Sequence, residues 1–425
     1  MKISDINLKI ILDSRGKDTL EAELFNGDFS IKASVPAGKS TGVHEAFVLE
    51  PKKALEKFEN IKPEILAMSA SGRIENQEEF DNFLIALDGT LSTGSGQAKS
   101  NLGANLILAL SLAFARLKAK KEGKELFQYI RQELKINFST GGQELKTLRP
   151  IFNVINGGSH STNKDSKLDF QEFQIIPETN DFNMAFSLGK IFYRKLGDYL
   201  RQKFGAENII LGDEAGYCAP FRNNEEALEA IAEVIEKYNY PVRIGLDVAA
   251  SQFYKDGYYE IGGKKYSSAE LREYYIKLAD TYNILSIEDP FYEESFDDFA
   301  ALFYGRAAND FLIITDDLTT TNPERLKRAI EKKSGNAILI KLNQIGTLTE
   351  TLKVAKLAYE SPTQNCVGDE NNWQAVVSHR SGETMDDFIA DLAVGINAWG
   401  LKAGAPAKPE RLIKYERILK ILNLK

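Results

Sequence analysis

The strongest constraint in the sequence is a rhythm of short β-branched runs from about residue 150 onward. Most runs end in a polar or charged residue, and helical patterns such as 322–333 and 347–359 lie between most of the later runs. The runs are PIFNVING, FQEFQIIP, NIILGDE, RIGLD, NILSIED, FLIITDD, AILIK and AVVSH. Strand–helix alternation over about 280 residues predicts a parallel sheet, most economically a barrel, with a doubly wound open sheet as the alternative.

The amino-terminal part of the chain follows a different pattern. Residues 19–24 and 29–35 alternate in polarity around an Asn-Gly-Asp turn at 26–28, which supplies the positive-φ positions of a tight hairpin. Residues 100–121 are apolar nearly all round and then rich in Lys and Arg, which is typical of a buried helix with a solvated end. We expect a small α+β domain that ends near residue 135, with a boundary at 137–150.

Composition narrows the class of protein. Lys and Arg total 53 against 61 Asp and Glu, so the net charge is −8 and a basic field for nucleic acid is absent. The two cysteines, Cys218 and Cys366, are far apart, which argues against a disulfide scaffold or a thiolate zinc site.

The longest apolar run, 106–115, is far shorter than the ~20 residues of a membrane span. The amino terminus carries acidic residues where a signal peptide is apolar, so we expect a cytoplasmic protein.

Acidic residues and a lysine follow successive strands of the predicted barrel. Asp247, Glu288 and the doublet Asp316–Asp317 end three runs, and Lys341 ends a fourth. The carboxyl ends of barrel strands surround one mouth, so these side chains are expected to converge. Such carboxylates repel one another unless a cation lies between them, and an all-oxygen set suits Mg²⁺. Adjacent side chains on a strand point to opposite faces, so we expect only one member of the doublet to face the mouth, and periodicity does not choose between them.

Lys341 is a candidate general base. It follows Ile338, Leu339 and Ile340, so its stem enters the site from an apolar wall. Near a metal dication and partly desolvated, its pKa should fall. The alternative is a lysine paired with a carboxylate for structural reasons.

A candidate phosphate clamp lies near the carboxyl end of the chain. SHRSGE (378–383) groups His379, Arg380 and Ser381 after a strand, and a guanidinium beside a hydroxyl binds phosphate well. The alternative is a surface Arg-Ser turn. GLKAGAP (400–406) adds Lys402, placed to hold a carboxylate or phosphate oxygen.

Two further motifs place a histidine and a glutamate where they could reach the predicted site. NGGSH (156–160) sets His160 beside a glycine turn that allows close backbone approach to a ligand. LGDEAG (211–216) puts Glu214 after another strand, as a candidate acid.

The loop VPAGKSTGVHEA (35–46) matches two motifs that its context excludes. Gly38-Lys39-Ser40 looks like the end of a phosphate-binding P-loop, but Ala33 stands where that motif needs glycine. Residues 38–42 match G-x-S-x-G, but a nucleophile elbow joins a strand to a helix in an α/β sheet, whereas this loop follows a hairpin. We interpret it as a mobile Gly-rich lid with His44 packed at its base.

Taken in order, these segments resemble the enolase family from about residue 3 to residue 420. The matching motifs are DSRG at 13, STGVHEA at 40, LDGT at 87, LGAN at 102, NGGSH at 156, DFQEF at 169, GDEAG at 212, DVAAS at 247, IEDPF at 287, DDLTTTNPERL at 316, IKLNQIGTLTET at 340, SHRSGET at 378 and GAPAKPERL at 404. The resemblance implies an α+β lid domain at 1–136, a three-stranded meander plus helices. An enolase-type eight-stranded (β/α) barrel would follow at 147–425, its first units departing from plain alternation.

The resemblance also implies catalytic and metal-binding roles. Lys341 would abstract the C2 proton of the substrate, and Glu214 would assist departure of the C3 hydroxyl. The first Mg²⁺ would be held by Asp247, Glu288 and Asp316; the 25-residue spacing to the lysine favours Asp316 over its neighbour. A second Mg²⁺, arriving with substrate, would bind Ser40 on the lid. Arg380 and Ser381 would hold the phosphate, and the pocket would be completed by Lys402, His160, Gln171, Glu172 and His379.

The implied reaction is the Mg²⁺-dependent, reversible dehydration of 2-phosphoglycerate to phosphoenolpyruvate in glycolysis and gluconeogenesis, by a homodimer or larger homo-oligomer. A positioned base contributes only ~10²–10⁴-fold, so charge stabilisation of the dianionic intermediate must supply most of the rest. One alternative is a relative that acts on another carboxylate, which the phosphate clamp opposes. Another is a catalytically weak protein of this fold that serves as a binding or surface protein, which the intact catalytic set opposes.

The chain also departs from the family pattern. Lys39 stands where the lid has a small residue, and we expect altered lid closure or Mg²⁺ dependence. Ala215, Gln252 and Ala403 replace a Gly, a Glu and a Thr, and 361–373 is an apparent insertion expected to form a surface loop. None of these changes removes a catalytic group.

Overall fold

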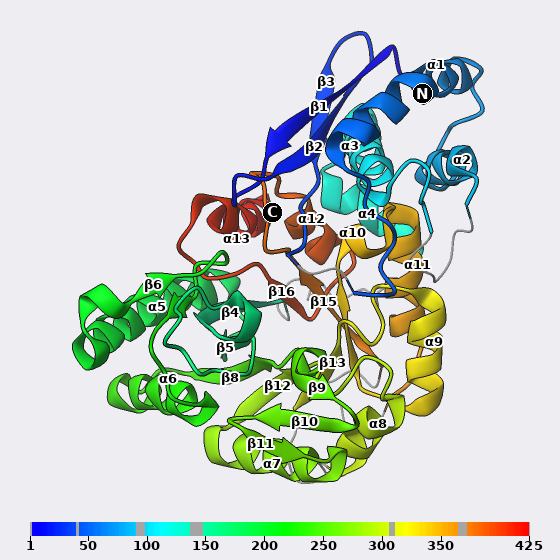
Figure 1. Ribbon diagram of the computed structural model, residues 1–425. Coiled ribbons are helices and arrows are strands. Elements are labelled where there is room, and N and C mark those ends of the chain that lie inside the picture. The colour runs from blue at the N-terminus through cyan, green and yellow to red at the C-terminus, as the bar shows by residue number, and fades with distance from the viewer. Residues whose placement is uncertain are drawn as a thin grey trace.

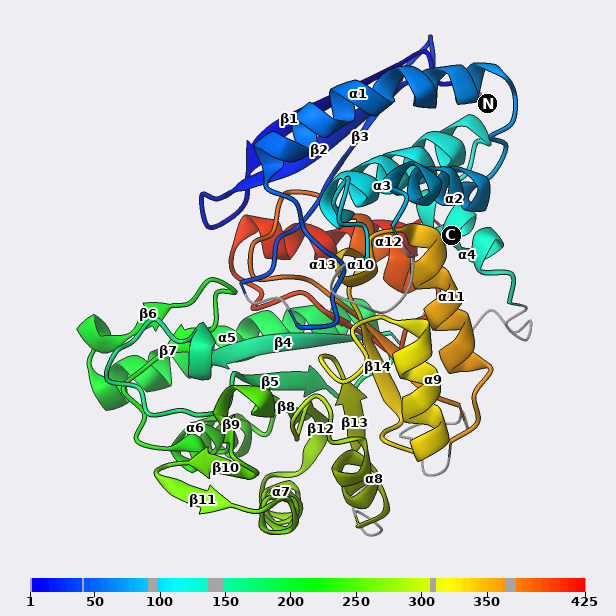
Figure 2. The same ribbon diagram turned by 45° about the vertical axis from the view of Figure 1, so that its right-hand side comes forward.

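The computed structural model describes residues 2–39, 42–90, 98–136, 148–305, 311–363 and 372–424. A three-stranded antiparallel sheet with its helices lies over one end of a closed barrel (Figure 1, Figure 2). Among the described residues, no helix is long and apolar enough to cross a membrane.

The amino-terminal sheet is an antiparallel meander of β1 (Asp5–Leu12), β2 (Asp18–Phe25) and β3 (Ser30–Ser34). The predicted hairpin turn is confirmed, and Gly27 has a φ of +63°. Four helices accompany the meander: α1 (Pro51–Ala70), α2 (Gln77–Asp88), α3 (Ala104–Lys121) and α4 (Leu126–Leu134). The predicted buried helix is α3, which is buried over nearly its whole length and ends in lysines.

Eight strands close into the barrel. They are β4 (Arg149–Asn156), β5 (Glu172–Pro177), β8 (Val242–Asp247), β12 (Ile284–Glu288), β13 (Leu312–Thr315), β14 (Ala337–Ile340), β15 (Gln374–Ser378) and β16 (Gly400–Lys402). The ring closes because β16 pairs in parallel with β15 on one side and with β4 on the other. All neighbouring pairs are parallel except those of β5, which runs antiparallel to β4 and β8. The barrel, and the departure of its first units from plain alternation, are therefore confirmed.

One β-branched run is not a barrel strand. NIILGDE forms only β6 (Ile210–Leu211), which pairs with β7 (Tyr217–Cys218), and β7 attaches to β4. The eighth barrel strand is instead β16, whose three residues are too few for a periodic pattern to reveal.

Strand register brings several acidic residues to one rim. Glu288 on β12 is aligned with Asp247 on β8, and both lie where their strands end. Because β5 is reversed, its first residue, Glu172, is aligned with Asp247 on one side and with Asn156 on the other. Residues that begin β5 therefore share the rim with residues that end its neighbours.

Helices cover the outside of the barrel. They are α5 (Phe182–Phe204), α6 (Asn224–Tyr238), α7 (Ser268–Tyr282), α8 (Phe296–Gly305), α9 (Pro323–Lys332), α10 (Leu342–Ile345), α11 (Leu348–Tyr359), α12 (Phe388–Gly395) and α13 (Pro409–Leu422). The helical patterns predicted at 322–333 and 347–359 are α9 and α11, which begin after the capping residues Asn322 and Thr347. A small sheet of β9 (Tyr254–Lys255), β10 (Tyr258–Ile261) and β11 (Lys264–Tyr266) precedes α7.

The barrel strands divide their side chains between two apolar clusters. Side chains such as Ile151, Ile314 and Leu339 form a cluster of their own, whereas their neighbours Phe152 and Ile313 belong to the larger core shared with the helices. This is the alternation expected when one face of each strand points into the barrel and the other toward the helices. Of the predicted loop at 361–373, residues 364–371 lie outside the described residues.

Buried and partly buried polar contacts join the amino-terminal helices to the barrel segments. On α3, Arg116 donates to the two oxygens of Asp386 at 2.6 and 2.8 Å and to Asp387 at 2.8 Å. On α2, Asp81 accepts from the backbone N–H of Thr349 at 2.9 Å. These contacts fix how the lid helices sit over the barrel.

We expect Arg116→Gln to lower the free energy of unfolding by about 3 kcal/mol, because it leaves the buried carboxylate of Asp386 without its counter-charge. Urea denaturation measures the change. In a control, Lys9→Gln removes the exposed partner of Glu21 and should leave the denaturation midpoint unchanged. Equal midpoints for the wild type and Arg116→Gln would contradict this role.

The buried carboxyl of Asp81 makes the free energy of unfolding depend on pH. Burial raises its pKa from 3.8 to about 6, although hydrogen bonds from Thr349, Ser111 and Gln77 oppose the shift. Between these values the folded protein binds more protons than the unfolded chain, so the free energy of unfolding falls as pH rises through the window, by about 3 kcal/mol. Urea denaturation of the wild type and Asp81→Asn from pH 4 to pH 8 tests this. The difference between them should change below pH 6 and stay constant above it; a difference constant throughout would exclude the effect.

Candidate functional site

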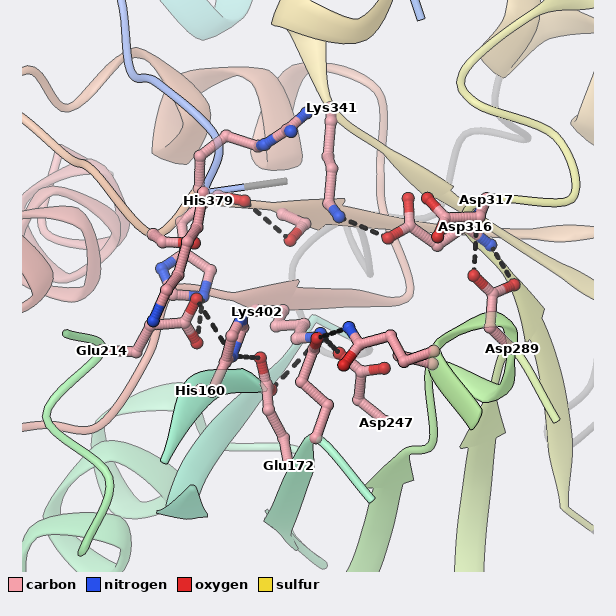
Figure 3. Close-up of a pocket in the computed structure, with 17 residues that line it drawn as sticks. His160, Glu172, Glu214, Asp247, Asp289, Asp316, Asp317, Lys341, His379 and Lys402 are labelled. Carbon is pink, nitrogen blue, oxygen red and sulfur yellow. Dashed lines mark hydrogen bonds and ion pairs between the residues drawn. The ribbon is translucent and has the colours of Figure 1, made fainter. Parts of the chain in front are cut away.

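A polar pocket lies at the carboxyl end of the barrel strands (Figure 3). Its lining consists of Lys39, His160, Gln171, Glu172, Glu214, Asp247, Ala249, Gln252, Asp289, Asp316, Asp317, Lys341, Ser378, His379, Arg380, Ser381 and Lys402. All of the site residues predicted from the sequence are in this lining except Glu288 and Ser40. Glu288 bonds to the lining residue Lys402, and Ser40 lies outside the described residues.

Lys402 joins three carboxylates. At the end of β16 its ammonium lies 2.9 Å from Asp247 Oδ2, 2.9 Å from Glu288 Oε2 and 3.3 Å from Glu172 Oε2. Burial lowers the pKa of Lys402, but Asp247, Glu172 and Glu288 outweigh burial and hold it well above its usual value. The side chain is therefore a fixed positive charge among the strand ends.

The carboxylates around Lys402 fit a hard divalent cation. Burial raises the pKa of Glu288 well above its usual value, and the neighbouring charge of Asp247 adds to the shift. A cation relieves both effects, and the donors at these strand ends are all oxygen atoms, as Mg²⁺ prefers. Asp247 and Glu288 both turn toward Lys402 in this structure, whereas Asp316 turns toward Lys341.

Lys341 and Asp316 form a buried ion pair at the ends of β14 and β13. Lys341 Nζ bonds Asp316 Oδ2, and Gln344 Nε2 donates to Asp316 Oδ1 at 2.9 Å. Burial lowers the pKa of Lys341, but Asp316 outweighs burial and the net shift is upward. The lowered pKa expected from the sequence refers to a lysine beside a metal dication; without the dication, the carboxylate that faces the lysine raises its pKa.

Both members of the Asp316–Asp317 doublet line the pocket, so the expectation that only one faces the mouth is wrong. The doublet follows the last residue of β13 and lies in a turn, where strand alternation no longer applies. Asp289 holds this turn by accepting from the backbone N–H of Asp316 at 2.9 Å and of Asp317 at 2.6 Å. One ligand atom from each of the three lies within 4.8 Å of the others. Asp289 was not predicted from the sequence, where its only signal is its place directly after Glu288.

Glu214 lies among polar side chains on another side of the pocket. It accepts from Asn153 Nδ2 at 3.1 Å, and its oxygens are 3.4 Å from His379 Nε2 and 3.7 Å from His160 Nδ1. Burial raises the pKa of Glu214, but His379 and His160 outweigh burial and hold it well below its usual value. Burial and the charge of Glu214 raise the pKa of Glu172, so of the two carboxyls Glu172 retains a proton more readily.

Arg380, the expected phosphate ligand, is paired with a carboxylate in this structure. The partner is Glu45, which was not predicted from the sequence. Arg380 donates to Glu45 at 3.0 and 3.2 Å and to Asn343 Oδ1 at 3.2 Å. Glu45 belongs to the loop at 35–46, and it also accepts from the backbone N–H of Gly42 at 3.0 Å. The loop and the clamp are therefore joined directly.

Other contacts anchor the same loop. His44 Nε2 lies 2.6 Å from Glu294 Oε1, outside the pocket lining, as suits a residue at the base of the loop. Lys39 lines the pocket and donates to the backbone oxygen of Ser159 at 2.9 Å, and it lies 3.8 Å from Asp213. This lysine thus bridges the loop to the barrel rim.

We expect Lys402→Gln to destabilise the metal-free protein by about 3 kcal/mol, because the buried carboxylates lose their counter-charge. Added Mg²⁺ should raise the melting temperature of the variant more than that of the wild type, since the metal then replaces the missing charge. Differential scanning calorimetry with EDTA and with Mg²⁺ measures both effects. The same Mg²⁺-induced shift in both proteins would contradict this account of Lys402.

The chain is similar to known proteins of one family along nearly its whole length. Two family models match: "Enolase, N-terminal domain" over residues 3–130 and "Enolase, C-terminal TIM barrel domain" over residues 146–424. Enolase of Methanocaldococcus jannaschii is 41% identical, over 99% of this chain and 95% of that protein. Enolase of Methanococcoides burtonii is 42% identical and that of Methanosarcina acetivorans 40%, each over 99% of this chain and 94% of the relative.

Proposed function

The chain belongs to the enolase family, and from this premise we propose that it catalyses the Mg²⁺-dependent, reversible dehydration of 2-phosphoglycerate to phosphoenolpyruvate. It is a lyase of the carbon–oxygen hydro-lyase class. The proposal includes a lid domain at 1–136, a barrel domain at 147–425, a homodimer or larger homo-oligomer, and a cytoplasmic location.

The observation that carries the proposal is the placement of Lys341 and Glu214 on different sides of one pocket, with Lys402 and its carboxylates between them (Figure 3). Dehydration removes a proton from C2 and a hydroxyl from C3. A base and an acid that approach from different sides reach the two carbons without competing for space. We assign Lys341 to the C2 proton and Glu214 to the departing hydroxyl. Because the pKa of Glu214 is low in the unliganded pocket, this role requires that Glu214 take up a proton when the negatively charged substrate binds.

We propose that Asp247, Glu288 and Asp316 hold the first Mg²⁺ and that Ser40 contributes to the second. Bound Mg²⁺ stabilises the negative charge that develops on the carboxylate oxygens of the substrate. A neutral amine is required of Lys341 as a base, and in the metal-free arrangement Asp316 opposes this by raising its pKa. Engagement of Asp316 as a ligand weakens the ion pair and leaves burial, which lowers the pKa, as the main influence on Lys341.

The substrate's phosphate and the rest of the substrate are proposed to bind separate parts of the lining. Arg380 and Ser381 would hold the phosphate, and the pocket would be completed by Lys402, His160, Gln171, Glu172 and His379. In this structure the guanidinium of Arg380 donates hydrogen bonds to Glu45. A bound phosphate therefore has to share the guanidinium with Glu45 or displace it. Binding is thereby linked to the loop that carries Glu45.

We expect Lys341→Ala to lower kcat by about 10³-fold, within the ~10²–10⁴ that a positioned base contributes. Formation of the enol phosphate, followed by ultraviolet absorbance with Mg²⁺ and with EDTA, measures it. Lys327→Gln, which changes an exposed lysine on α9, is the matched control and should leave kcat unchanged.

Exchange of the C2 proton with deuterated solvent separates the two catalytic roles. Lys341→Ala should lose exchange together with dehydration, whereas Glu214→Gln should lose dehydration and keep exchange. The function is refuted if the intact protein shows no metal-dependent turnover, and the role of Lys341 is refuted if its variant keeps exchanging.

A further inference from the structure

Arg411 on α13 is fully buried, and its guanidinium bonds to neutral acceptors. Nη1 donates to His379 Nδ1 and, at 2.7 Å, to the backbone oxygen of Arg380. Nη2 donates to the backbone oxygens of Ser381 at 2.5 Å and Asp213 at 3.3 Å. The nearest carboxylate oxygen recorded in the described part of the chain is that of Glu410, 3.9 Å from Nε.

A guanidinium only donates hydrogen bonds and is not deprotonated in proteins. The imidazole nitrogen that faces it must therefore accept, so His379 Nδ1 carries no proton. The neutral ring then has its hydrogen on Nε2. We infer that Arg411 is a positioning residue that fixes His379 as the neutral Nε2–H tautomer and so turns an N–H donor toward Glu214 and the pocket.

The position of Nε2 agrees with this assignment. It lies 3.4 Å from Glu214 Oε2, it makes no hydrogen bond in the described structure, and His379 lines the pocket. A buried donor without a partner is costly, so this N–H is poised to bond either Glu214, after a small approach, or an acceptor on a molecule bound in the pocket.

Packing keeps the ring in place. Gly404 has a φ of +82°, and a Cβ there would lie 3.1 Å from both Arg411 Cδ and His379 Cε1. The imidazole is thus enclosed by the backbone of Gly404 on one side and by the guanidinium on another. A half-turn of the ring would put a carbon in place of Nδ1 opposite Arg411 and would lose this hydrogen bond.

The charges around the ring favour its neutral form. The charged groups that act on it are Glu214 before β7, Glu383 in its own loop and Arg411 on α13. Burial lowers the pKa of His379 to about 4, and Arg411 adds to the lowering while Glu214 and Glu383 oppose it. Protonation would place an N–H of the ring directly against the donors of Arg411.

The guanidinium of Arg411 also holds two loops of the pocket next to each other. It bonds carbonyl oxygens of Arg380 and Ser381, in the phosphate clamp, and of Asp213, which precedes Glu214. The catalytic consequence rests on the proposed function, whereas the tautomer does not.

The test uses the small number of histidines. With only three in the chain, ¹⁵N-histidine labelling gives a spectrum that one variant, His379→Asn, assigns. Long-range ¹H–¹⁵N spectra of the wild type should show His379 with an unprotonated Nδ1 and a protonated Nε2, unchanged from pH 6 to pH 8. A protonated Nδ1 or an imidazolium at pH 7 would overturn the inference without any arginine variant.

Arg411→Gln should give His379 a mixture of tautomers or a titration above pH 5, and Arg411→Lys, which keeps a charged donor, should restore the wild-type pattern. The matched control is Arg417→Gln on the same helix, which removes a pair with Asp391 and Glu125 at 2.7 Å. It should destabilise the protein and leave the His379 signals unchanged. Wild-type signals in Arg411→Gln would contradict the inference.

In the dehydration assay, Arg411→Gln should lower kcat by about 10- to 100-fold, by analogy with the loss of a group that orients a metal-bound histidine. Arg417→Gln should stay within about twofold of the wild type. Absence of turnover in the wild type would defeat the proposed function and leave the tautomer result standing. Turnover with an unaffected Arg411→Gln would defeat the positioning role alone.

Discussion

The buried carboxylates at the mouth of the barrel repel one another, and the ammonium groups of Lys341 and Lys402 offset that repulsion. Lys402 lies between Asp247 and Glu288 and offsets part of their charge, and Lys341 pairs with Asp316. A buried charge of either sign is costly alone, so the ends of β8, β12, β13, β14 and β16 are stable only together. The same balance determines what the pocket accepts. A cation added to the carboxylates frees positive charge on the lysines, so metal and anionic substrate are taken up as complementary parts.

The site residues that could be predicted from the sequence are those marked by a pattern of neighbouring residues. Asp247, Glu288 and Lys341 each come at the end of an apolar run, so their meeting at the mouth follows from barrel topology alone. Their partners are not local: Glu45 and Arg380, for example, are 335 positions apart. Such pairs depend on how the lid sits on the barrel, and no pattern within a window of residues contains that information.

The fold shows the same division between local and non-local information. Alternation of strands and helices predicted the barrel, but the strand that closes it, β16, has three residues and no pattern of its own. Alternation also failed at Asp316 and Asp317, because the rule that separates neighbouring side chains ends where the strand ends. The pKa of Lys341 depends on a carboxylate 25 positions away, whose orientation only the packed structure provides.

The reversed strand β5 gives the mouth of the barrel a connection that both starts and ends at the pocket. The chain leaves β4 at the mouth and re-enters the barrel at the mouth, so the connection carries His160, Gln171 and Glu172 without crossing the outside of the barrel. In this hairpin, His160 comes from the start of the connection, and Gln171 and Glu172 come from its end, where β5 pairs with β8. One connection therefore supplies groups to the pocket from both of its ends, whereas a parallel unit supplies them only after its strand.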